Sequence, residues 1–278
     1  MTSISEVFQK SGSYPMAEIS QFTQPDASPA YFVDFLDFLD KQEPIRTLRA
    51  EAAKRMQIGG GQRILDVGCG VGGATFLIGD LTEPTGLAAG VDVSSALIDV
   101  AKQRAGARPG IEFRIGDACA IPYPDRYFDG ARSERVFLYV PDRVGAIQEM
   151  KRVVKSGGRV CLIDTDFDSI AIYSTNRALT RKMTSIIAES IPNPNSAREL
   201  PALATHTGLK HIQVESFALR TPHDFLERSM SGALWRAAES GVATTREEVS
   251  EWLGDQAALH ASGDFYQAWL FVMVTGTV

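Results

Sequence analysis

The chain has 278 residues, enough for one large domain or two small ones, and 44% of them are hydrophobic, so a sizeable core can form. The net charge is −6 with no dense block of lysine and arginine, which argues against a nucleic-acid substrate, because proteins that bind nucleic acids normally present a basic stripe. No apolar run is long enough to cross a bilayer.

The first 29 residues contain three prolines among polar residues, and we expect them to form an irregular arm. They lack the apolar stretch of a secretory signal. The cysteines are few, odd in number and far apart, which argues against a disulfide framework or a zinc site: Cys69, Cys119 and Cys161. These features favour a reducing, cytoplasmic location.

Two helices are predicted before the first strand. Over residues 30–41, aromatic and leucine side chains recur every three to four residues with aspartates between them, a pattern typical of an amphipathic helix with an aromatic face. This helix either packs on the main domain, covers a ligand site as a lid, or contacts a second copy of the chain. Pro44 separates it from a second predicted helix at 45–56, which carries Arg49.

The stretch 63–73, RILDVGCGVGG, joins a predicted strand to a glycine-rich loop. A short apolar run around Asp66 suits a strand buried on both faces. Glycines at alternate positions, beginning with Gly68 and Gly70, allow the backbone to turn tightly and to lie against a ligand. Such loops occur at dinucleotide, phosphate and S-adenosylmethionine (SAM) sites, and Gly73 keeps the dinucleotide spacing open.

Further predicted strands follow at regular intervals. The segment at 88–92, AAGVD, ends in Asp92, and the segment at 111–117, IEFRIGD, ends in Asp117. A fourth strand opens at 127–133, YFDGARS, and a fifth runs over 159–168.

Four motifs, in this order, resemble those of the class I SAM-dependent methyltransferases: LDVGCGVGG, GVDVS, GDACAIPYPDRYFD and VKSGGRV. The resemblance covers roughly residues 45–170 and is closest to the quinone-biosynthesis-type and natural-product small-molecule methyltransferases. It implies an α/β, Rossmann-like, doubly wound fold: a mostly parallel seven-stranded sheet with an antiparallel final strand and a helical cap.

The resemblance implies SAM as the cofactor and suggests roles for the strand ends. Asp92 is expected to hold the ribose hydroxyls, because an ionised carboxylate only accepts hydrogen bonds. Asp117 and the Ala118 backbone are expected to meet the adenine, and Asp66 to brace the loop. The full set expected to bind the cofactor is Arg49, Asp66, Gly68, Cys69, Gly70, Asp92, Val93, Asp117, Ala118 and Ser133.

The catalytic residues are less clearly marked. In related enzymes a histidine is common where this chain has Tyr139, whose hydroxyl either orients an acceptor or serves packing. Of the four histidines, His223 is the best placed to act as a base, at the start of a predicted cap helix. No metal site is expected at the three alternating acids of the fifth strand, Asp164, Asp166 and Asp168.

Beyond residue 168 the resemblance thins. A helix is predicted around residues 179–187, a capping box at Ser196 and Glu199, a strand at 211–217, and a final strand at 269–278. We therefore expect an arm with a lid helix at 1–44 and a SAM-binding domain at 45–278. Helical cap insertions at about 170–198 and 222–261 would lie above the strand ends.

The expected function is methyl transfer from SAM to a small organic acceptor, with C-, O- and N-methylation all open. Three alternatives remain: an enzyme of the same fold that catalyses a non-methylating step such as cyclisation, a non-catalytic SAM-binding partner protein, and a nicotinamide dehydrogenase. No hydride-transfer constellation supports the last of these. The expected partners are a small-molecule acceptor and, through the N-terminal helix, a second copy of the chain.

Overall fold

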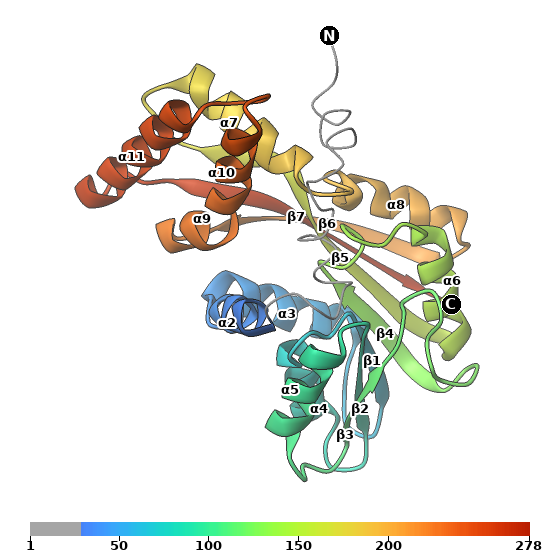
Figure 1. Cartoon of the computed structure of the whole chain (residues 1–278). Helices are drawn as coiled ribbons and strands as arrows, with labels where there is room; N and C mark the ends of the chain where they lie inside the picture. The colour runs from blue at the N-terminus through green and yellow to red at the C-terminus, as the bar shows by residue number, and fades with distance from the viewer. Residues whose placement is uncertain (1–28) are drawn as a thin grey trace.

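A computed structural model of the protein describes residues 29–278. Its centre is a seven-stranded sheet in the order β3-β2-β1-β4-β5-β7-β6 (Figure 1). The strands are β1 (Arg63–Val67), β2 (Leu87–Asp92), β3 (Ile111–Ile115), β4 (Phe128–Glu134), β5 (Val154–Ile172), β6 (Lys210–Arg220) and β7 (Gln267–Thr277). The helices are α2 (Pro29–Asp40), α3 (Glu43–Met56), α4 (Gly73–Thr82), α5 (Ser95–Ala105), α6 (Arg143–Val153), α7 (Arg177–Glu189), α8 (Ser196–His206), α9 (His223–Ser229), α10 (Ser231–Ser240) and α11 (Arg246–Ser262).

The chain changes direction across the sheet at β1. It runs from β1 through β2 to β3 on one side, then returns to place β4 on the other side of β1, with all four strands parallel. The final strand β7 is antiparallel to both β5 and β6. The expected doubly wound, mostly parallel sheet with an antiparallel last strand is therefore confirmed. The carboxyl ends of β1 and β4 lie at the point where the strand order reverses, which is where such sheets bind ligands.

Alternate residues of the strands feed two separate cores. Ile64 belongs to a core with α3, α7 and the cap helices, whereas its neighbour Leu65 belongs to a core with α6 and α8. This alternation follows from the two-residue period of a strand, and it explains why β1 is buried almost throughout. Both faces of the sheet are thus covered, which leaves the carboxyl ends of its strands for a ligand.

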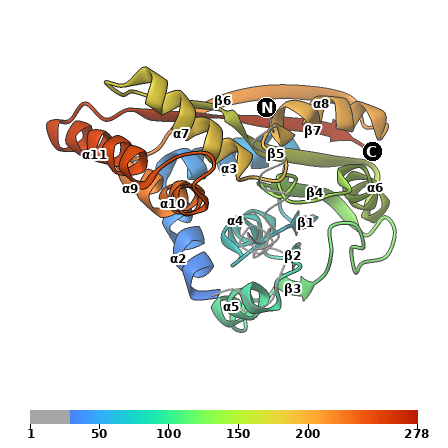
Figure 2. The ribbon, with the colours of Figure 1, turned by 45° about the horizontal axis from the view of Figure 1, so that its top comes forward.

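Helix α2 lies between the sheet domain and the cap. It packs against α3, α4 and α5, and two of its phenylalanines, Phe35 and Phe38, contact Phe225 of α9 with ring centroids 6.2 and 6.5 Å apart. Figure 2 shows α2 between α5 and the helices α9 and α10. The predicted amphipathic helix is confirmed. Residues 1–28 of the expected arm lie outside the described part of the chain.

One local expectation is wrong. Ser196 is not the cap of its helix, because the cap position is Asn195 and the Ser196 hydroxyl donates to Asp164 Oδ2 at 2.6 Å. Helix α6 ends at Val153, where the chain directly enters β5. Among residues 29–278, no helix is both long enough and apolar enough to cross a membrane.

Candidate functional site

One large cavity opens at the carboxyl ends of the central strands, with a volume of about 1240 Å³. The ends of β1, β2, β4 and β5 and the helix α2 border it, and the cap closes its far side. This volume exceeds the range of about 300–1,000 Å³ that is usual for a single small-molecule site. The cavity can therefore hold a cofactor and a second ligand together.

The glycine-rich loop is fixed to the neighbouring strand. The N–H groups of Gly68 and Cys69 donate to the carbonyl of Val91 at 2.7 and 3.1 Å. Gly68 has a φ of +72°, and a Cβ there would come within 2.1 Å of Val136 Cγ2. A side chain at this position would therefore collide with Val136, which also lines the cavity, and would displace the loop.

Asp66 lies at the end of β1 and connects it to the helix that follows the loop. It is buried, and Thr75 Oγ1 in the first turn of α4 donates to its Oδ2 at 2.8 Å. The guanidinium of Arg132 lies 3.5 Å from its other oxygen. Burial nevertheless raises the pKa of Asp66, against the opposing effects of Arg132 and Thr75.

Asp92 lies at the tip of β2 with both carboxylate oxygens engaged. Oδ2 accepts from the Gly70 N–H at 2.8 Å and Oδ1 from the Ser94 N–H at 2.9 Å. Burial raises the pKa of Asp92 to about 6, although the two N–H groups lower it. Each oxygen keeps a second lone pair, so the carboxylate can still accept from a diol that reaches the cavity.

A network of six buried or half-buried charged side chains forms the floor of the cavity. Glu134 is its centre: it accepts from Arg49 Nε at 3.0 Å and Arg132 Nη2 at 2.6 Å, and Arg135 lies 3.4 Å away. Burial alone would raise the pKa of Glu134, but the three guanidinium groups hold it well below its usual range. The remaining two members are Asp66 and Asp40, whose Oδ1 accepts from Arg49 at 2.6 Å.

Ten of the twelve residues predicted for the site line this cavity: Arg49, Asp66, Gly68, Cys69, Gly70, Asp92, Val93, Asp117, Ala118 and Tyr139. Asp117 also caps its own turn, accepting from the Cys119 N–H at 2.8 Å. Burial, followed by the charge of Asp164, raises the pKa of Tyr139 well above its usual range. Tyr139 therefore stays protonated at neutral pH, which suits a hydrogen-bond donor and not a base.

Ser133 does not reach the cavity, contrary to expectation. It is fully buried on β4, between Arg132 and Glu134, which both line the cavity. Successive side chains of a strand point to opposite faces, so Ser133 is directed into the sheet's other face.

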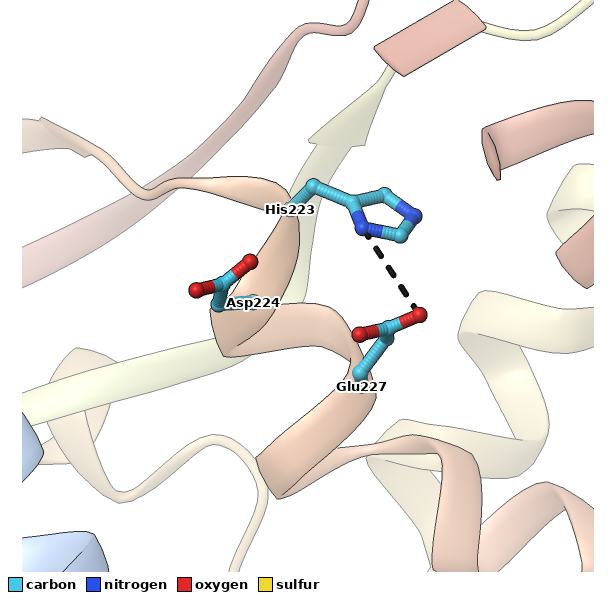
Figure 3. A group of neighbouring side chains, drawn as sticks. All are labelled: His223, Asp224 and Glu227. Atoms are coloured by element: carbon cyan, nitrogen blue, oxygen red, sulfur yellow. Dashed lines mark ion pairs between the residues drawn. The ribbon is translucent and has the colours of Figure 1, made fainter. Parts of the chain in front are cut away.

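His223 does not line the cavity either, so the expectation that it acts as a base there is wrong. Its ring is buried, stacks on His260 with centroids 4.7 Å apart, and meets the edge of Phe265. Figure 3 shows it beside Glu227 on α9, with Nδ1 and Oε1 3.8 Å apart, and Asp224 next to it in the chain. The cavity-lining face of α9 carries Phe225 and Arg228 instead.

Several residues that line the cavity were not identified by the sequence motifs. Arg132 and Glu134 are charged residues two positions apart in an otherwise buried strand, and that spacing is the signal that could have identified them. Asp40 carries no such signal. Its carboxylate lies against the start of α4, where a Cβ on Gly73 would come within 2.0 Å of Oδ2. Only the tertiary structure brings α2 to this place.

The cavity suits SAM in the chemistry of its donors and acceptors. Its lining from residues 31–142 includes six carboxylates and three arginines, an acidic balance that favours a cationic sulfonium. Glycine backbone at Gly68 and Gly70 lets a ligand approach closely, and Asp92 offers acceptor capacity for vicinal hydroxyls.

Comparison with known proteins supports this assignment. Residues 65–162 match the family described as "Methyltransferase domain". A demethylmenaquinone methyltransferase of Staphylococcus aureus is 27% identical over 199 residues, covering 66% of this chain and 83% of that protein. An uncharacterized 37.1 kDa protein from transposon TN4556 of Streptomyces fradiae is 31% identical over 180 residues, 63% of this chain. The match spans about half (51%) of that relative.

Solved structures share the fold at low sequence identity. The YcgJ protein of Bacillus subtilis superposes with a TM-score of 0.58 at 18% identity, over 82% of this chain and 97% of that one. The [4+2]-cyclase SpnF superposes with a TM-score of 0.53 at 20% identity, over 84% and 81%. One fold thus carries both methyl transfer and cyclisation, and only the site can separate them.

Proposed function

Because this chain belongs to the class I SAM-dependent methyltransferases, we propose that it transfers the methyl group of SAM to a small organic acceptor. The observation that carries the proposal is the single cavity at the switch point of the sheet, where the glycine loop and the tips of β1 and β2 meet a second, cap-lined space. A cofactor and an acceptor can thus lie side by side in one enclosure.

SAM supplies an activated methyl group on a sulfonium, so the protein mainly has to align the acceptor and exclude water. Asp92 would accept from the ribose hydroxyls, and Asp117 with the Ala118 backbone would meet the adenine. Asp66 holds the loop in place through Thr75. Helix α2 would exclude water, since Phe32, Phe35 and Leu36 line the cavity.

Arg49 is proposed to face the carboxylate of the methionine moiety. Its guanidinium lines the cavity and is already paired with Asp40 and Glu134. Tyr139 would orient the acceptor as a hydrogen-bond donor, because its raised pKa keeps the hydroxyl protonated. An acceptor whose proton must be removed would therefore rely on another group or on its own acidity.

The proposal extends to location and assembly. We place the reaction in the cytoplasm, since none of the three cysteines is paired. With a net charge of −6, a nucleic-acid substrate is not part of the proposal. A second copy of the chain could pack on Tyr31 of α2, which is 51% exposed.

The test is mass spectrometry of phenolic, quinol and amine acceptors incubated with methyl-labelled SAM. The proposal predicts S-adenosylhomocysteine together with a product heavier by one labelled methyl group. A product of unchanged mass would identify the non-methylating alternative. Binding of SAM without turnover of any acceptor would favour the non-catalytic partner protein.

A further inference from the structure

The cavity is electrically polarised along its length. Among the described lining residues from 165–271, none is aspartate or glutamate and three are arginine: Arg220, Arg228 and Arg236. This contrasts with the acidic lining near the glycine loop. The cap end of the cavity, which we call the cap chamber, is thus basic where the cofactor end is acidic.

The walls of the cap chamber are aromatic. Phe167 and Phe225 each meet the ring of Trp269 nearly edge to face, with centroids 5.0 and 5.3 Å apart, and all three line the cavity. Phe35 of α2 adds a fourth ring through its contact with Phe225. Edge-to-face rings form rigid apolar surfaces that suit a flat hydrocarbon body.

Two arginines of the chamber keep hydrogen-bonding capacity for a ligand. Arg228 lies over the ring of Phe38 at 5.2 Å and Arg220 over Tyr266 at 5.5 Å. Within residues 29–278, neither has a carboxylate within 4.0 Å. A guanidinium stacked on a ring still directs its N–H edge outward, in the planar fork that binds a carboxylate.

A third arginine reaches the cavity from the end of β4. Arg135 Nε is buried and, in the described structure, has no hydrogen-bond partner. Its backbone has a φ of +58°, an uncommon conformation for a non-glycine residue that is found at functional sites. Burial lowers the pKa of Arg135, whereas Glu134, whose Oε1 lies 3.4 Å from its guanidinium, raises it.

We propose that the acceptor is a small molecule with an aromatic body and an anionic group, most simply a carboxylate, held in the cap chamber by Arg220 and Arg228, with Arg135 facing the same cavity from the end of β4. This inference rests on the proposed function and specifies its substrate class. The aromatic walls bind the body, and Arg220 and Arg228 fix the anion at the end of the cavity opposite the acidic cofactor lining. The anion is an anchor, which leaves another atom of the acceptor to face the methyl donor.

The test uses the full chain saturated with S-adenosylhomocysteine, whose own binding is measured first by calorimetry. The protein is then titrated with 2-naphthoate, its neutral isostere 2-naphthamide and the cation 2-naphthylmethylamine. We expect 2-naphthoate to bind at least about tenfold more tightly than 2-naphthamide, the effect of a charge-assisted hydrogen bond. The amine should bind most weakly, and added salt should reduce the difference.

Matched variants assign the effect to the arginines. Arg228→Gln and Arg220→Gln should each weaken 2-naphthoate binding and leave 2-naphthamide binding unchanged. Arg246→Gln, an exposed arginine of α11 outside the cavity, should change neither.

The inference is overturned if the two isosteres bind equally, if neither binds at millimolar concentration, or if the cavity variants leave the preference intact. A failure of S-adenosylhomocysteine to bind would instead count against the proposed function, so the two outcomes are distinguishable.

Discussion

At the scale of single residues, burial of Asp92 disfavours the ionised form that ligand binding requires. Its pKa is raised to about 6, whereas an unfolded aspartate titrates near pH 3.9. Between these values the folded protein retains the proton longer than the unfolded chain, so its stability falls as the pH rises across this window. The carboxylate that should hold the ribose therefore costs the cofactor-free protein stability at neutral pH.

We expect the affinity for SAM to fall as the pH is lowered from about 8 to about 5, because protonation removes acceptor capacity from Asp92. The loss should be about tenfold or more, since a hydrogen bond to a charged group contributes about 1.5–3 kcal/mol. Calorimetric titrations at several pH values measure it.

The matched variant is Asp92→Asn, which should bind SAM more weakly at neutral pH and show little pH dependence over the same range. If the wild-type dissociation constant is constant with pH, or the variant keeps the wild-type profile, Asp92 is not the titrating group that contacts the ligand.

The pKa of Glu134 is shifted in the opposite direction to that of Asp92, because three guanidinium groups converge on Glu134. Its pKa is lowered, so its stabilising effect is complete above the ordinary glutamate pKa and is lost as the pH falls through the folded value. Glu134→Gln leaves Arg49, Arg132 and Arg135 with only two carboxylates, and should lower the free energy of unfolding by about 3–5 kcal/mol. Urea denaturation at neutral pH measures this loss.

The control is Glu239→Gln, at a surface pair with Arg246 that is more than half exposed on both sides. Its effect should stay within about 1 kcal/mol. Equal effects of the two substitutions would show that the buried network does not contribute to stability in this way.

At the scale of elements, α2 joins the two halves of the site. Leu36 Cδ1 lies 3.0 Å from where a Cβ on Gly70 would be, and Asp40 pairs with Arg49. Leu39 is 1% exposed, so the C-terminal end of α2 belongs to the core. Its middle instead contacts the cap through aromatic rings, which is the part suited to open and close.

We predict that Phe35→Ala and Phe225→Ala each speed the release of SAM by about two- to tenfold, since an aromatic pair contributes about 0.5–1.5 kcal/mol. Because both substitutions remove the same contact, the double variant should be little faster than either single variant. Stopped-flow measurement of SAM release gives these rates.

Tyr173→Ala serves as the control, because this exposed tyrosine lies outside the main cavity. Unchanged SAM release from both single variants would show that the contact between Phe35 and Phe225 does not slow release. Fully additive effects would show that the two rings do not act through this shared contact.

The elements near the glycine loop were predictable because their signals are local. Periodicity predicted α2 and β1 almost to the residue. Ser94 caps α5 by accepting from the Leu97 N–H, a contact that is equally local. The errors arose where a long-range contact replaced a local one. Ser196 matches a capping box, yet its hydroxyl bonds to Asp164, which is 32 residues away in the chain.

The residues of the site can likewise be divided into those with a local sequence signal and those without one. Loop glycines and strand-tip acids follow from motif and topology, since parallel strands bring their carboxyl ends to one edge. The residues of the cap chamber come mainly from β5, β6, α9, α10 and β7 and share no spacing in the sequence. His223 illustrates the limit: its position in the chain placed it on the right helix, but only packing against α11 decided which face it occupies.

At the scale of the whole molecule, the fold brings one acidic and one basic surface to opposite ends of a single cavity. The parallel half of the sheet supplies the acidic end, and the antiparallel strands with their helices supply the basic end. A cationic methyl donor and an anionic acceptor would each find a complementary end, with the reacting atoms between them.

The most direct test of the account is a calorimetric titration of the full chain with SAM, S-adenosylhomocysteine and NAD. We predict saturable binding of both adenosyl ligands at one site per chain and no binding of NAD, with thermal stability raised only by the ligands that bind. Binding of NAD without any response to SAM would contradict the account at its centre.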